Sequence, residues 1–212
     1  MDISAIYDQH FFEMHAPWRQ EYDAIADVLA RFLEFSSELD LGCGNGFLID
    51  RLARRHGKHI TGIDGSEHAW HSAPDAIRSR FIIADLTAPP RLEAHDLVIC
   101  SEVAEHLAKC HAEMLVDNIR RHALRSVFFT AATPGQGGLH HVNEQPHRYW
   151  IAKFDERKFH LDDQATQAIR GALRRVLDKT WWFADNALVL RPLSAVGSRA
   201  AGEEQHAVDR AQ

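Results

Sequence analysis

Short apolar runs alternate with amphipathic stretches through most of the chain, and this alternation predicts the architecture. The apolar runs have the length of buried strands and occupy residues 38–41, 58–63, 80–84, 96–100, 127–131 and 187–190. The stretches with helical spacing occupy residues 46–56, 67–77, 109–124, 147–158 and 164–177. Strands that alternate with helices are typical of a doubly wound, mostly parallel sheet, so we predict a Rossmann-like α/β fold.

The segment before the first strand has a different pattern. Residues 18–35 carry apolar side chains at helical spacing, at Ile25, Val28, Leu29, Phe32 and Leu33. An aromatic stretch comes first, and its side chains either pack on the domain or cover a ligand cleft: Tyr7, Phe11, Phe12, Trp18 and Tyr22. We therefore expect a helical cap over 1–35, one α/β domain over 36–192, and a disordered tail over 193–212.

The composition and charge of the chain argue against some kinds of partner. The chain has 212 residues, of which 45% are hydrophobic, and this is enough for one buried core. Its net charge of -6 leaves no excess of lysine and arginine for a phosphate backbone, which argues against a nucleic-acid partner. No run approaches the roughly 20 apolar residues of a membrane span, and the start lacks a leader pattern. We expect a cytoplasmic protein without a membrane partner, either a monomer or a homodimer.

A glycine-rich motif follows the first predicted strand. Gly42, Gly44 and Gly46 stand at alternate positions just before a predicted helix. Glycines let the backbone turn sharply beside a ligand, and the helix start offers free N–H groups. A dinucleotide site would require glycine or alanine at the sixth position of this motif, where the chain has Phe47. The motif thus predicts a nucleotide-like ligand but disfavours a nicotinamide cofactor.

Carboxylates follow the next two predicted strands. Asp64 ends the second strand and is suited to two ribose hydroxyls. Asp85 ends the third and is suited to the amine of adenine, with Leu86 beside it as an apolar contact. Ligands of open parallel sheets bind beyond the carboxyl ends of the strands, so these side chains predict an adenosine-containing ligand.

From Ser36 to Leu190 these motifs resemble the class I S-adenosylmethionine-dependent methyltransferases. The resemblance implies that S-adenosylmethionine is the cofactor and that 36–192 is the domain that binds it. It places the methionine part beside the glycine-rich motif and the methyl group beside the end of the fourth strand. The cofactor-binding residues that it implies are Asp40, Gly42, Cys43, Gly44, Asn45, Gly46, Asp64, Gly65, Asp85, Leu86, Ser101 and Glu102.

Acidic and histidine side chains at Glu102, Glu105 and His106 follow the fourth predicted strand at one-turn spacing. Joined by a later histidine such as His141, they resemble the divalent-metal site of small-RNA 3′-terminal 2′-O-methyltransferases. Similar segments also resemble those of metal-free family members that act on small molecules. The acidic balance of the chain favours the second interpretation, and a divalent metal on these four residues stays an alternative.

A loop rich in glycine and histidine follows the fifth predicted strand. Residues 135–150 match a segment, GQGGxxHVNEQPxxYW, of a poorly characterised bacterial and viral methyltransferase subfamily that this chain resembles. The chain departs from that subfamily near its end, where Phe183 and Asp185 replace a tyrosine and a glutamine. Neutral imidazole accepts a proton near pH 7, so we expect His141 to be the general base or substrate anchor, with His106 second and Glu102 beside them.

The expected function is S-adenosylmethionine-dependent O-methylation of a small-molecule or glycan hydroxyl. Two alternatives stay open. One is metal-dependent 2′-O-methylation of an RNA terminal ribose. The other is a module that binds S-adenosylmethionine without catalysing a reaction and serves as a partner in a biosynthetic complex.

Overall fold

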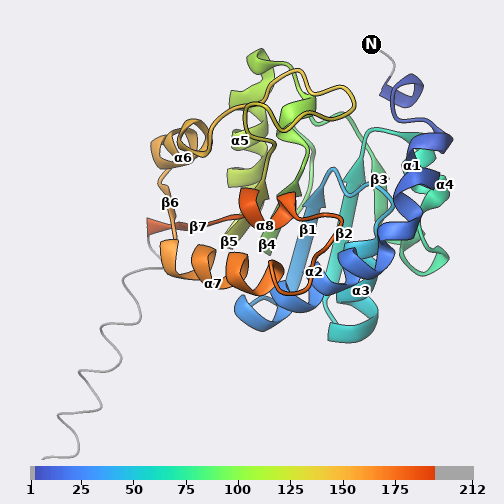
Figure 1. Ribbon diagram of the computed structural model, residues 1–212, viewed down its shortest axis with the longest axis horizontal. Coiled ribbons are helices and arrows are strands. Elements are labelled where there is room, and N and C mark those ends of the chain that lie inside the picture. The colour runs from blue at the N-terminus through green and yellow to red at the C-terminus, as the bar shows by residue number, and fades with distance from the viewer. Residues whose placement is uncertain (1–2, 194–212) are drawn as a thin grey trace, which may run out of the picture.

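A computed structural model describes residues 3–193 of the chain and shows one seven-stranded sheet (Figure 1). The strand order is β3-β2-β1-β4-β5-β7-β6. Strands β1 to β5 are parallel, and β7 runs antiparallel to both of its neighbours. The strands are β1 (Ser37–Leu41), β2 (His59–Asp64), β3 (Phe81–Ile83), β4 (His95–Ser101), β5 (Ala123–Thr130), β6 (Phe159–Leu161) and β7 (Leu188–Pro192).

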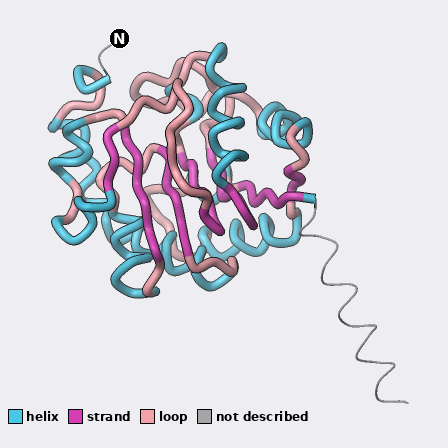
Figure 2. The backbone as a smooth tube through the Cα atoms, turned by 180° about the vertical axis from the view of Figure 1, so that it is seen from behind, coloured by secondary structure: helices cyan, strands magenta, loops and turns pink. Residues whose placement is uncertain are grey.

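Helices cover both faces of this sheet, and Figure 2 shows the strands from behind as a twisted layer among them. Along β4, Leu97 and Ile99 point into one core while Val98 and Cys100 point into the other, because successive side chains alternate across a sheet. The first core lies under α2, α3, α7 and α8, and the second under α5 and α6. The helices are α1 (Gln9–His15), α2 (Arg19–Phe32), α3 (Phe47–His56), α4 (Glu67–Ser72), α5 (Ala112–His122), α6 (His147–Glu156), α7 (Asp163–Leu173) and α8 (Trp182–Asn186).

The Rossmann-like α/β prediction is confirmed, whereas several element boundaries were wrong. The helix predicted over 67–77 ends at Ser72, because Pro74 interrupts it, and a 3-10 helix follows over Asp75–Arg80. The helix predicted over 109–124 stops at His122, and β5 begins at Ala123, four residues earlier than expected. Strand β6 was missed, because it follows the predicted helix over 147–158 directly and has a histidine between its two apolar residues, so no apolar run marks it. The predicted tail lies outside the described residues except for Leu193.

The segment before β1 forms two helices. The amphipathic helix predicted over 18–35 is α2, whose apolar face is buried through Ile25, Val28 and Leu29. Ahead of it, Phe11 and Phe12 of the aromatic stretch lie on α1, which Asp8 caps by accepting a hydrogen bond from Phe11 N at 2.9 Å. Helix α1 packs against α4, at the edge where the carboxyl ends of the strands emerge (Figure 1). No described helix is long and apolar enough to cross a membrane.

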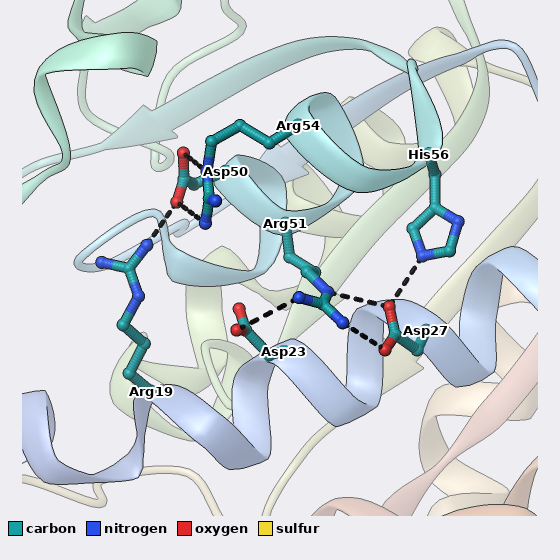
Figure 3. A network of polar contacts seen from close by, with 7 residues as sticks. All are labelled: Arg19, Asp23, Asp27, Asp50, Arg51, Arg54 and His56. Carbon is teal, nitrogen blue, oxygen red and sulfur yellow. Dashed lines mark hydrogen bonds and ion pairs between the residues drawn. The ribbon is translucent and has the colours of Figure 1, made fainter.

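Ion pairs join α2 to α3 (Figure 3). The carboxylate of Asp50 is 1% exposed and accepts hydrogen bonds from Arg54 at 2.8 and 2.9 Å and from Arg19. The guanidinium group of Arg51 forms a bidentate ion pair with the carboxylate of Asp27, with hydrogen bonds of 2.7 and 2.9 Å. Arg19 is the first residue of α2, so its pair with Asp50 fixes the start of that helix against the helix that follows the glycine-rich loop.

Replacing Asp50 with alanine is expected to lower the free energy of unfolding by about 1–3 kcal/mol, because two arginines lose a buried, charged acceptor. Urea denaturation measures this change. The matched control is Asp27→Ala, because the carboxylate of Asp27 is 42% exposed. Because solvent screens that pair, we expect a loss of about 1 kcal/mol or less. An Asp50→Ala protein as stable as the Asp27→Ala protein would contradict this assignment.

Candidate active site

A cavity of about 530 Å³ opens at the carboxyl ends of the parallel strands, where the strand order reverses between β1 and β4. This is the position where open α/β sheets bind ligands. Most of the predicted cofactor residues lie on its wall. These are Asp40, Gly42, Cys43, Gly44, Asn45, Asp64, Gly65, Asp85, Leu86, Ser101 and Glu102.

The glycine-rich loop turns tightly between β1 and α3. The N–H groups of Gly42 and Cys43 both donate to the carbonyl oxygen of Ile63 at 2.8 Å. A side chain at Gly42 would place a Cβ atom 2.3 Å from Val103, in the turn after β4. Gly46 has a φ of 66° and caps α3, and it is absent from the cavity wall. The structure therefore gives Gly46 a role in the turn and in helix packing.

Buried carboxyl groups concentrate at the ends of β1 and β2. Asp40 is 3% exposed, and its Oδ1 has no hydrogen-bond partner among the described residues. Burial, and then the nearby Asp64, raise the pKa of Asp40 to about 8. Burial also raises the pKa of Asp64, although its carboxylate accepts hydrogen bonds from Gly44 N and Ser66 N, both at 2.9 Å. A cation entering the cavity would favour the charged form of both groups.

The turn after β3 presents Asp85 and Leu86 to the same cavity. Oδ1 of Asp85 accepts a hydrogen bond from Thr87 N at 2.8 Å. Asn118, on α5, donates to the carbonyl oxygens of Leu86 and Ala88 at 3.1 and 3.0 Å. This buried amide fixes the turn that carries Asp85.

Glu102 is held by two amides from distant parts of the chain. Its backbone has a φ of 53°, and its N–H donates to the carbonyl oxygen of Thr130 at 3.0 Å. Its carboxylate accepts hydrogen bonds from Gln136 Nε2 and Asn186 Nδ2, both at 3.1 Å. Asn186 Nδ2 also donates to Gln136 Oε1 at 2.8 Å. Glu102 is therefore paired with the loop after β5 and with α8.

Glu105, His106 and His141 form a separate cluster on the cavity wall. One potential ligand atom from each lies within 4.8 Å of the other two, and Glu102 is not part of this group. The rings of His106 and His141 meet edge to face with centroids 4.9 Å apart. Burial, and then His141, lower the pKa of His106 to about 4, so His106 is neutral at pH 7. Burial raises the pKa of the Glu105 carboxyl group, and the charge of Glu102 raises it further.

Glu144 organises the loop that carries His141. Its carboxylate accepts hydrogen bonds from the N–H groups of Gly135 and Gly137, both at 2.7 Å, and lies 2.9 Å from His141 Nδ1. The next residues join the turn after β4, because the N–H groups of Val142 and Asn143 donate to the carbonyl oxygen of Glu105 at 2.9 and 3.0 Å. The loop predicted to border the site is thus anchored to the turn that carries the other histidine.

Several residues of this site were missed from the sequence. Glu144 and Gln136 belong to the loop motif over 135–150, but neither they nor Asn186 received a role, although the position of Glu144 three residues after His141 indicates a pair. His140 has a φ of 58°, is not part of the cavity wall, and its carbonyl oxygen lies 3.4 Å from His106 Nδ1.

Residues 39–125 match the profile of a family described as methyltransferase domain. The chain is 33% identical over 181 residues to a ubiquinone biosynthesis O-methyltransferase of Psychrobacter cryohalolentis, covering 70% of this chain and 66% of that protein. It is 27% identical over 220 residues to the malonyl-[acyl-carrier protein] O-methyltransferase of Salmonella typhimurium, and the match covers 95% of this chain and 81% of that protein. Two further ubiquinone biosynthesis O-methyltransferases match over only 32% of their own length.

The fold is also that of solved methyltransferases. The chain superimposes on human N-acetylserotonin methyltransferase in complex with S-adenosylmethionine with a TM-score of 0.60, and the match covers 90% of this chain and 59% of that one. At 16% sequence identity, this likeness bears on the fold alone.

Proposed function

We propose that this chain, which contains an S-adenosylmethionine-dependent methyltransferase domain, transfers a methyl group to a hydroxyl oxygen of a small acceptor. The observation that carries the proposal is the set of carboxyl groups at the strand ends, from the buried Asp40 through the half-buried Asp64 to the exposed Asp85, on a cavity whose described wall has no lysine or arginine. S-adenosylmethionine carries a sulfonium and an ammonium group, so such a wall is complementary to it. The similarity to two proteins named O-methyltransferases supports oxygen as the acceptor atom.

In this proposal, the end of each of the first three strands binds a different part of the cofactor. Asp64 binds the ribose hydroxyls through the lone pairs that Gly44 N and Ser66 N leave free. Asp85 accepts a hydrogen bond from the adenine amine, with Leu86 against the ring. Asp40, whose Oδ1 lacks a partner among the described residues, faces the ammonium of the methionine part.

Binding of S-adenosylmethionine is expected to release a proton. The pKa of Asp40 is about 8 in the free protein, and the cation requires the carboxylate form. Because the free site holds a proton below that pKa, the association constant should rise with pH, by up to about tenfold per pH unit, and level off above the pKa of Asp40. Calorimetric titrations over about pH 6 to 9 measure this slope.

The matched control for that experiment is Asp40→Asn, which cannot lose a proton in this range. We expect weaker binding and a flattened pH dependence in this variant. An unchanged slope in the variant would mean that another group titrates, and it would remove Asp40 from the proposed cofactor site.

The proposed reaction is a direct displacement. The acceptor oxygen attacks the methyl carbon, the carbon–sulfur bond breaks, and its electron pair stays on sulfur as S-adenosylhomocysteine leaves. The hydroxyl proton passes to Nε2 of His141, whose Nδ1 is turned toward Glu144. The carboxylate of Glu144 then stabilises the imidazolium that forms. The neutral ring of His106 contacts His141 edge to face and lies on the wall of the same cavity.

The cluster of Glu105, His106 and His141 supports a second candidate, in which a divalent ion assists the same transfer. Both imidazoles have a partner near Nδ1, and one carboxylate stands beside them, a donor set that suits transition metals. When bound there, such an ion would lower the pKa of the acceptor hydroxyl. The RNA substrate is disfavoured, because no described lysine or arginine lines the cavity to receive a phosphate.

Release of S-adenosylhomocysteine, measured with a panel of small hydroxyl compounds and with and without a chelator, tests the proposal. Turnover that survives chelation supports the metal-free reaction. Turnover that chelation abolishes and a divalent ion restores would favour the metal-assisted form. Tight binding of S-adenosylmethionine without any acceptor-dependent release would contradict the proposal in favour of a binding module.

A further inference from the structure

A continuous series of ring contacts leads away from the histidine cluster along the cavity wall. Tyr7 contacts His106 with centroids 5.5 Å apart and Phe11 at 5.0 Å. Phe11 contacts His15 at 4.2 Å, and His15 contacts Trp18 at 4.7 Å. Trp18 reaches Trp182 of α8 at 5.7 Å, and Trp182 contacts Trp181 at 6.0 Å. We call this series the aromatic wall; its members are Tyr7, Phe11, His15, Trp18, Trp182 and Trp181, and all six line the cavity.

The two ends of the aromatic wall differ. At the inner end, the hydroxyl of Tyr7 is buried, has no hydrogen-bond partner among the described residues, and lies beside His106. Burial, with Glu105 and Asp64 nearby, raises the pKa of Tyr7, so its hydroxyl keeps its proton. At the outer end Trp181 is exposed, and so is Met14, the lining residue that precedes His15 in the chain. The inner end thus offers polar groups, and the outer end is an apolar rim.

Charge limits what binds between these ends. The described wall of the cavity has acidic side chains but no lysine or arginine, so a phosphate or carboxylate on the acceptor would be desolvated without a positive partner. The carboxylate of Glu102 accepts hydrogen bonds from the amides of Gln136 and Asn186. Aromatic faces favour flat rings, which gain edge-to-face or offset contacts beyond simple burial. A glycan, with hydroxyls around its ring, would find few polar partners along this wall.

We infer that the acceptor is an uncharged aromatic hydroxyl compound with an apolar substituent. Its ring lies along the aromatic wall, its hydroxyl reaches His106 and His141, and its substituent extends to the rim at Met14 and Trp181. The inference rests on the proposed function and replaces the broader choice of a small-molecule or glycan hydroxyl with one chemical class.

Binding of matched compounds to the complex with S-adenosylhomocysteine tests this inference. The four probes are p-butylphenol, p-butylcyclohexanol, p-hydroxybenzoate and methyl glucoside. We expect p-butylphenol to bind about 3- to 10-fold more tightly than p-butylcyclohexanol, because only the former has a ring face for the aromatic wall. The carboxylate and the glycoside are expected to bind more weakly still. Equal or tighter binding of either of these two would overturn the inference.

Variants show whether the aromatic wall is the binding surface. Trp18→Leu and Trp182→Leu are each expected to weaken p-butylphenol binding about 3- to 10-fold and to leave S-adenosylhomocysteine affinity unchanged. The control is Trp70→Leu on α4, a partly buried tryptophan outside the cavity wall. Equal losses in all three variants would contradict a binding role for the aromatic wall.

The same titrations separate this inference from the proposed function. If S-adenosylhomocysteine itself does not bind, the proposed function fails. If it binds and p-butylphenol does not, only the aromatic acceptor is ruled out.

Discussion

Replacing His141 with alanine is expected to lower kcat about 100- to 10,000-fold, the contribution typical of a positioned general base. The reason is geometric. Glu144 lies 2.9 Å from Nδ1 of His141, and it is itself held by the N–H groups of Gly135 and Gly137. The remaining nitrogen, Nε2, is therefore fixed in direction and belongs to a residue on the cavity wall. The measurement is kcat with the best acceptor of the hydroxyl panel.

The control for His141→Ala is His160→Ala. His160 also pairs with a carboxylate, Asp155 at 2.8 Å, but it stands on β6 and is not part of the cavity wall. We expect full turnover from this variant. Cofactor affinity in His141→Ala should stay within about twofold of the parent, because no cofactor contact is assigned to that ring. Retained turnover in His141→Ala would remove it from catalysis and leave His106 as the candidate base.

Replacing Asp64 with alanine is expected to raise the Kd for S-adenosylmethionine about 100-fold or more. Two charge-assisted hydrogen bonds to ribose would be lost, each worth about 1.5–3 kcal/mol. The glycine-rich loop would also lose a support, because Gly44 N donates to this carboxylate at 2.9 Å. Calorimetric titration measures the change.

An exposed aspartate provides the matched control for Asp64. Asp75 is 89% exposed and pairs with Arg78 on the surface. Asp75→Ala is expected to bind S-adenosylmethionine as the parent does. If Asp64→Ala also bound it unchanged, the ribose would have to lie elsewhere, and the order of the cofactor along the strand ends would be wrong.

Local patterns predicted the parts of this molecule that depend on local physics. Alternating burial along β4 and the helical spacing in α2 are properties of neighbouring residues, so they were visible in the sequence. Asp40, Asp64 and Asp85 were predictable as one group because each lies at or just beyond the carboxyl end of a parallel strand, and parallel strands end at the same edge of a sheet.

The parts that were missed depend on contacts between distant segments. Glu102 was expected to border the methyl group, with a metal at this residue only as an alternative, and the contacts of its carboxylate with Gln136 and Asn186 were not foreseen, the latter residue lying 84 positions away. No periodicity signals such a pair. The aromatic wall likewise joins Trp18 to Trp182, which meet only because α8 folds back beside the N-terminal helices. In contrast, the position of Glu144 three residues after His141 lies within one loop and was available to sequence reasoning.

The most direct test of the proposed activity follows an isotopically labelled methyl group from S-adenosylmethionine to the product by nuclear magnetic resonance. With p-butylphenol as acceptor, we predict that the label appears in a methyl ether while S-adenosylhomocysteine accumulates in equal amount. A label that stays on sulfur with every hydroxyl acceptor, or that appears on nitrogen or carbon, would contradict transfer to oxygen at this site.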